Sequence, residues 1–263
     1  MIRRAVIAMV VAASAAPAAG QSADTAQAAA SAPRIEILSR YSFHLSAEHL
    51  TSDDDRFIWD TNFGGELDLI DYGGGRATFV ANYQAILGNE FRTFDPNQGN
   101  YILAGSMSAR VAPLEVAAFF HHESRHLSDR FKRPPVDWNM AGARVLLNQM
   151  RGRVSLAEHL DIAGAVQKSF VDYRWEMNGH AGARAPVAPR LAVIASADVR
   201  VLGVDGSRDR GTQSGFRGEG GLRIEGPAAA AEIFVAGERR IDPYPLEFGH
   251  DAWLSAGFRL VTR

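Results

Sequence analysis

The segment that decides the fold is FRGEGGLRIE, at residues 216–225. Its large apolar side chains, Phe216, Leu222 and Ile224, occupy even positions, whereas its charged side chains all occupy odd positions. Successive side chains of a β-strand point to opposite faces, so a strand here has one apolar and one charged face. The pattern predicts a strand that separates an apolar environment from a polar one.

The same alternation runs through most of the chain from Ile35 onward, and few windows sustain a helical period. It predicts an all-β protein with twelve strands, at residues 35–45, 57–69, 79–87, 101–111, 114–124, 138–147, 153–166, 175–183, 191–201, 216–224, 229–235 and 252–260. One alternative stays open at residues 153–168, because Ser155 and Glu158 have the spacing of a helix capping box. A helix there would leave ten strands.

The lengths of these segments favour a membrane barrel over a soluble β-sandwich. Most of the expected strands hold about ten residues, as tilted membrane strands do, whereas soluble strands usually hold about five or six. The connections also alternate in length, as do the periplasmic turns and outer loops of membrane barrels. Short connections are expected at residues 71–76, 112–113, 150–152, 185–189 and 226–228, and long ones at 46–56, 88–99, 125–137, 168–174, 203–213 and 239–250.

The four tryptophans point to the same class of protein. Each begins an expected strand that follows a long loop: Trp59, Trp138, Trp175 and Trp253. Indole rings favour the headgroup level of a bilayer, so this placement predicts one aromatic belt at the outer surface. We therefore expect a single closed antiparallel transmembrane β-barrel in the cell outer membrane.

The N-terminus predicts export. Arg3 and Arg4 precede a short apolar run and then small residues, so residues 1–20 are expected to be a secretory signal peptide. Residues 21–33 contain mostly Ala, Ser and Gln and are expected to form a disordered periplasmic leader before a barrel at residues 34–263. Insertion of such a barrel makes the barrel-assembly machinery an expected partner.

Composition excludes several classes of function. The formal net charge is -2 without a block of Lys and Arg, which argues against a nucleic-acid partner. The chain has no cysteine, so an exported fold needs another source of stability, such as barrel closure. The charges on the polar faces are expected to form a satisfied network in the lumen, among them Glu36, Arg40, Glu66, Asp68, Arg110, Glu115 and Arg144.

One segment combines residue types that can do chemistry, FHHESRHLSD at residues 120–129. By strand parity His122 and Ser124 face outward, and the parity of the returning strand turns Asn139 outward as well. A hydroxyl, an imidazole and an amide on one surface can form a nucleophilic set, with Ser124 as nucleophile, His122 as base and Asn139 orienting the ring.

The H-x-S of His122 and Ser124, followed across a loop by Trp138-Asn139, resembles the outer-membrane phospholipase A family and the lipid A 3-O-deacylases. This resemblance implies a twelve-stranded barrel with a Ser-His-Asn triad on its lipid-facing outer wall. It implies acyl-ester hydrolysis of phospholipid or lipid A, with calcium as a candidate cofactor. Those families continue the motif with Asn and a small residue, where this chain has Arg125 and His126.

Several non-catalytic interpretations stay open. The run H-x-S-x-H-L-x-D at residues 122–129 also resembles a group of bacterial outer-membrane proteins without an assigned function. The protein could be a narrow channel, an envelope structural protein or a lipopolysaccharide-binding protein, with a polar outer rim. The clustered histidines with Asp129 could then bind a metal ion or the phosphates of lipopolysaccharide. In each case outer-membrane lipids are the expected partners.

Overall fold

The computed structural model describes residues 35–128, 130–131 and 134–262. The expected signal peptide and leader at residues 1–33 and the acidic residue Asp129 lie outside the described residues. No helix in the described part of the chain is long and apolar enough to cross a membrane.

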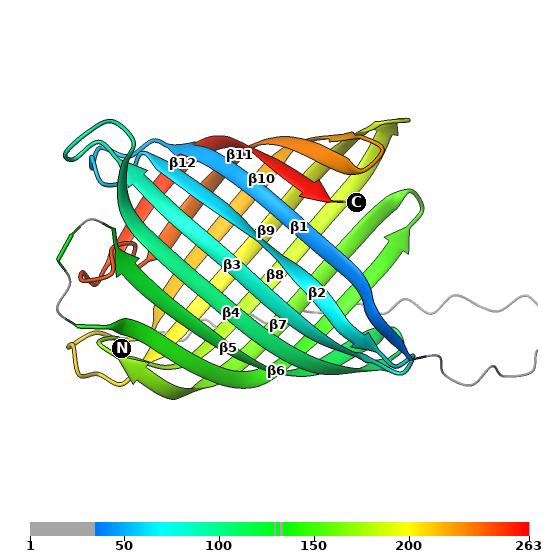
Figure 1. The fold of residues 1–263 in the computed structure, drawn as a ribbon, viewed down its shortest axis with the longest axis horizontal. Coiled ribbons are helices and arrows are strands. Elements are labelled where there is room, and N and C mark those ends of the chain that lie inside the picture. The colour runs from blue at the N-terminus through cyan, green and yellow to red at the C-terminus, as the bar shows by residue number, and fades with distance from the viewer. Residues whose placement is uncertain (1–34, 129, 132–133, 263) are drawn as a thin grey trace, which may run out of the picture. The chain divides into compact units, whose positions relative to one another are not determined.

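Residues 35–262 contain a closed barrel of twelve antiparallel strands (Figure 1). The strands are β1 (Glu36–Leu50), β2 (Trp59–Asp71), β3 (Arg76–Gly88), β4 (Asp95–Val111), β5 (Leu114–Leu127), β6 (Val136–Arg151), β7 (Val154–Ser169), β8 (Tyr173–Ala188), β9 (Leu191–Val204), β10 (Gln213–Glu225), β11 (Ala229–Ile241) and β12 (His250–Thr262).

Each strand pairs with its neighbour in the chain, and β1 pairs with β12 to close the barrel. Closure removes the unpaired strand edges that a bilayer does not tolerate. The predicted twelve-stranded antiparallel barrel is therefore confirmed. The alternative of a helix at residues 153–168 is wrong, because this segment lies within β7, where Ser155 pairs with Met150 of β6 and Arg184 of β8.

The connections gather by length at the two ends of the barrel (Figure 1). Turns of two to four residues lie at one end, together with the start of β1 and the end of β12. Longer connections lie at the other end, at residues 51–58, 89–94, 128–135, 205–212 and 242–249. The connection predicted to be long at 168–174 is short, with only residues 170–172 between β7 and β8. The loop end is the outer end by the usual topology of such barrels.

The outer wall is apolar. Every strand carries exposed large apolar or aromatic side chains, for example Phe63 (48% exposed), Phe120 (46%) and Val235 (63%). A continuous apolar surface of this size is not stable in water, whereas a bilayer covers it. The fold and its surface are those of an outer-membrane β-barrel.

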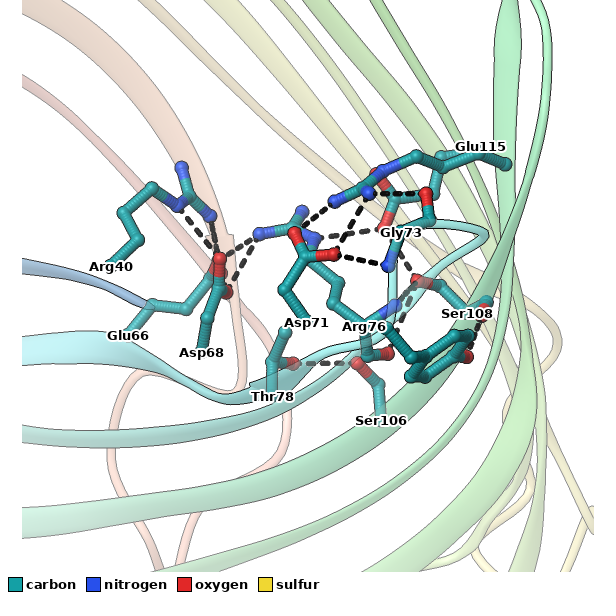
Figure 2. Close-up of polar contacts among 12 residues, drawn as sticks. Arg40, Glu66, Asp68, Asp71, Gly73, Arg76, Thr78, Ser106, Ser108 and Glu115 are labelled. Carbon is teal, nitrogen blue, oxygen red and sulfur yellow. Dashed lines mark hydrogen bonds and ion pairs between the residues drawn. The ribbon is translucent and has the colours of Figure 1, made fainter. Parts of the chain in front are cut away.

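The interior is polar at the turn end and filled with ion pairs. In Figure 2, Arg76 lies among Glu66, Asp68 and Glu115, at 3.0, 2.9 and 2.8 Å, and Arg40 bonds to the first two of these. The prediction of a satisfied network is confirmed for Arg40, Glu66, Asp68, Arg110, Glu115 and Arg144. Glu36, at the start of β1, is exposed.

Towards the loop end the interior contains two apolar clusters. One surrounds Trp138, which is fully buried, and the other contains Trp253, which is 6% exposed. Their rings lie beneath inward arginines, Arg200 and Arg240, at 5.9 and 5.3 Å from the guanidinium carbons. The predicted belt of four outward tryptophans is therefore wrong for these two, because the start of a strand sets the depth of a residue but not the face on which it lies.

Candidate functional site

Strand β5 has an outward face and an inward face that follow the predicted parity. Phe120 is 46% exposed on the wall, whereas its neighbour Phe119 is 8% exposed and lies in the interior. Glu123 is also buried and bonds to interior arginines. His122 and Ser124, which lie on either side of Glu123 in the sequence, are partly exposed, as expected for residues on the outer wall.

His122 and Asn139 lie directly opposite each other on β5 and β6 and are hydrogen-bonded. The distance between Nδ1 of His122 and Oδ1 of Asn139 is 2.7 Å. An amide oxygen only accepts hydrogen bonds, so Nδ1 of His122 donates the proton. The other ring nitrogen, Nε2, then carries the lone pair that a general base requires.

Ser124 lies between two histidines on the same face of β5. Its hydroxyl is 3.0 Å from Nε2 of His126, two residues towards the outer end, while His122 lies two residues in the other direction. The structure thus brings His122 and Asn139 together, and the Ser124 hydroxyl bonds to His126. The alternation H-x-S-x-H in the sequence contained this signal, since residues two apart on a strand share a face.

Asn139 also has a partner on the next strand. Its side-chain Nδ2 donates to Oε1 of Gln167, and Nε2 of Gln167 donates to a carboxylate oxygen of Asp137 at 3.1 Å. Gln167 reaches this face because β7 contains an irregularity at Val166: Asn139 pairs with Gln167, whereas Met140 pairs with Ala165. The extra residue reverses the parity of β7, so sequence alternation alone could not identify Gln167 as part of the site.

An aromatic row lies on the wall beside Ser124. The ring centroids of Phe63 and Tyr83 are 5.2 Å apart, and those of Tyr83 and Tyr101 are 4.8 Å apart. Tyr101 lies directly opposite Ser124 on β4 and meets the His126 ring edge-on at 5.5 Å. The polar residues of the site therefore border an apolar and aromatic surface of the barrel.

Arg125, one of the two positions at which the motif departs from the families it resembles, faces the interior. Its guanidinium lies 3.2 Å from Glu123, donates to the backbone oxygen of Asp242 and lies 5.3 Å from the Trp138 ring. The departure at this position therefore leaves the outward face of β5 unobstructed.

No group of three or more His, Asp or Glu side chains is arranged to hold a metal ion within residues 35–128, 130–131 and 134–262. The interior offers a cavity of about 500 Å³ near the turn end. Its charged lining residues are ion-paired with one another or with nearby residues: His180, Arg184, Glu219, Arg223, Glu232 and Arg259. On the outer wall, partly exposed residues of catalytic type meet at His122, Ser124 and Asn139.

The fold is similar to those of solved outer-membrane barrels. Outer membrane phospholipase A from Escherichia coli matches with a TM-score of 0.52 and 10% identity, over 84% of this chain and 92% of that chain. LpxR from Salmonella typhimurium matches with 0.48 and 9%, over 84% and 99%. The KdgM porin matches with 0.46 and 7%, over 83% and 97%. At such identities the similarity to the phospholipase establishes the fold alone.

No protein-family model matches the chain, and no curated protein matches it in sequence.

Proposed function

We propose that this outer-membrane barrel is an acyl-ester hydrolase that acts on phospholipid or on the ester-linked acyl chains of lipid A. Ser124 is the nucleophile, His122 the general base and Asn139 the residue that orients the imidazole. The observation that carries this proposal is the 2.7 Å hydrogen bond between His122 and Asn139 on the lipid-facing wall, with Ser124 beside it on the same face.

The reaction follows from the roles of these groups. Nε2 of His122 takes the proton of the Ser124 hydroxyl as the oxygen attacks the ester carbonyl, and the lipid alcohol leaves with that proton. Water then attacks the acyl-enzyme and gives one proton to the same nitrogen, and that proton passes to the departing Ser124 oxygen as the fatty acid is released. The hydrogen bond from Nδ1 to Asn139 stabilises the imidazolium that forms in each step.

Before attack, the hydroxyl of Ser124 turns about its Cα–Cβ bond from His126 towards His122. Such a change of staggered conformer is small, and catalytic hydrogen bonds often form only when the substrate is bound. His126 then lies next to the nucleophile and not in the triad. This distinction can be tested, because the two histidines flank Ser124 at equal spacing.

The position on the wall suits a lipid substrate. Ser124 lies three residues from the outer end of β5, where lipid ester groups meet the headgroup region. The row of Phe63, Tyr83 and Tyr101 offers an apolar surface along which an acyl chain can lie. One solved barrel with this fold is outer membrane phospholipase A from Escherichia coli, which agrees with the proposal.

The test is fatty-acid release by the purified protein from detergent-dispersed phospholipid and from lipopolysaccharide, with and without calcium. Ser124→Ala and His122→Ala are each expected to lower turnover by several orders of magnitude. Asn139→Ala is expected to lower it less, because Asn139 takes no part in bond making. Ser155→Ala, at the turn end of β7, is the matched control and keeps full activity.

Two results would contradict the proposal. If wild-type protein releases no fatty acid from either substrate under any of these conditions, the protein is a non-enzymatic barrel. If His126→Ala abolishes release while His122→Ala keeps it, the base is His126 and the assigned triad is wrong.

A further inference from the structure

The hydrogen bonds behind His122 form a chain that involves three strands, β5, β6 and β7, and ends on a carboxylate. His122 bonds to Asn139 at 2.7 Å, Asn139 bonds to Gln167, and Gln167 bonds to Asp137 at 3.1 Å. Asp137 and Asn139 lie two residues apart on β6, and Gln167 faces them from β7. The chain therefore runs from β5 through β6 to β7 and then returns to β6, where it ends at Asp137.

The direction of each hydrogen bond in this chain depends on its last member. An ionised carboxylate only accepts hydrogen bonds, so Asp137 draws the NH2 group of Gln167 towards it. The amide oxygen of Gln167 then points to Asn139 and accepts from its NH2 group. The amide oxygen of Asn139 is left to face His122, so Nδ1 of the imidazole must carry the proton.

We infer that Asp137 and Gln167 are positioning residues that hold His122 in the tautomer with a free Nε2. This inference rests on the proposed function, since only a general base at His122 requires that tautomer. If Asn139 were turned over, its NH2 group would face Nδ1, and the proton would move to Nε2. An Nε2–H cannot accept the proton of Ser124.

The irregularity in β7 supports a specific role for Gln167. Without the extra residue at Val166, regular alternation would direct the Gln167 side chain into the lumen, away from Asn139. Such irregularities are common next to active sites, where they re-aim one side chain. The irregularity in β7 lies where this strand pairs with Asn139, and Asn139 is the residue that the hydrogen bonds from Gln167 and Asp137 have to orient.

The first arm of the experiment measures the tautomer directly and needs no activity. Ring nitrogens of ¹⁵N-histidine-labelled barrel in detergent micelles give different NMR signals when protonated and unprotonated, and His122→Gln identifies the signals of His122. Wild type is expected to show a protonated Nδ1 and an unprotonated Nε2. Asp137→Asn, whose amide can donate as well as accept, is expected to give a mixture of both tautomers.

The second arm measures turnover. Asp137→Asn should lower kcat on the order of 10-fold, as the loss of an outer partner of a functional histidine commonly does, and leave KM unchanged. The double variant Asp137→Asn/Gln167→Glu should restore kcat, because the new carboxylate accepts from both amides and again fixes Asn139. A merely structural role for Asp137 would not be rescued by a change at position 167.

The inference is overturned if Asp137→Asn leaves the NMR signals of His122 unchanged, or if the double variant stays as impaired as the single one. Failure of the proposed function looks different. In that case wild type releases no fatty acid, whereas the NMR arm still reports which ring nitrogen carries the proton and whether Asp137 decides it.

Discussion

Replacing Trp138 by alanine tests the assignment of this residue to the interior. The side chain is fully buried, contacts the Tyr173 ring edge-on at 5.1 Å and lies beneath the guanidinium groups of Arg125 and Arg200. Buried Trp-to-Ala changes cost about 3–5 kcal/mol of unfolding free energy. The indole nitrogen has no hydrogen-bond partner among the described residues, and an unpaired buried donor costs about 1–3 kcal/mol in the wild type. The expected loss is therefore at the low end, about 3 kcal/mol.

Trp175→Ala is the matched control. Trp175 is 40% exposed on the wall, so its removal exchanges lipid contact and leaves no cavity in the barrel. Urea unfolding of the barrel in lipid vesicles measures both losses, with the folded fraction read from heat-modifiable gel mobility. Trp138→Ala should lower the unfolding free energy by more than twice as much as Trp175→Ala. Equal losses, or a larger loss at Trp175, would refute the distinction between interior and wall.

Two further predictions concern charged groups. Glu176 is 1% exposed and bonds to a histidine and an arginine inside the barrel, so Glu176→Leu should cost about 3–5 kcal/mol. Glu247→Leu, at an exposed pair with Arg56, should cost about 0–1 kcal/mol in the same urea assay, and equal costs would contradict the prediction. In the loop after β1, the hydrogen bond from Arg56 lowers the pKa of Asp54 below 3.8. The loop contact therefore stabilises the folded state above about pH 4 and is lost as the pH falls through the folded pKa. NMR titration should give a midpoint for Asp54 that rises in Arg56→Met, and an unchanged midpoint would be evidence against the contact.

The strands could be predicted from the sequence because one physical requirement acts on every residue of the barrel. A wall between lipid and a polar lumen requires alternation, and FRGEGGLRIE satisfies it in β10 without exception among its charged residues. The capping-box spacing of Ser155 and Glu158 is a local signal of one turn. The pairing of β7 with both neighbouring strands involves nearly the whole segment, so it outweighs this local preference for a helix.

The tryptophans show why two signals must be combined. The belt prediction uses only the depth of each indole in the membrane, which depends on its distance from a loop. The face depends on parity, and on β6 the inward Arg144 already implies that Trp138 is inward too. The Trp138 ring is stabilised in the interior by cation–π contacts with the inward Arg125 and Arg200 and by a T-shaped contact with Tyr173.

The outward positions of His122, Ser124 and Asn139 followed from parity, but their contacts could not. Whether the Ser124 hydroxyl meets His122 or His126 depends on one side-chain torsion, and alternation carries no information about torsions. The partner of Asn139 depends on an extra residue in β7, which changes the face of Gln167 without any mark in the apolar pattern.

The alternation that turns His122 and Ser124 outward also explains how the candidate site is held. Between and beside the outward His122 and Ser124 lie the inward His121, Glu123 and Arg125, and each of these bonds to another part of the interior. His121 is tied to β8, Glu123 to β9 and Arg125 to the backbone after β11. Residues of a functional site need a support that fixes them to a fraction of an ångström. Because the supports are the sequence neighbours of the outward residues, β5 is anchored from the lumen at the positions where its other face meets lipid.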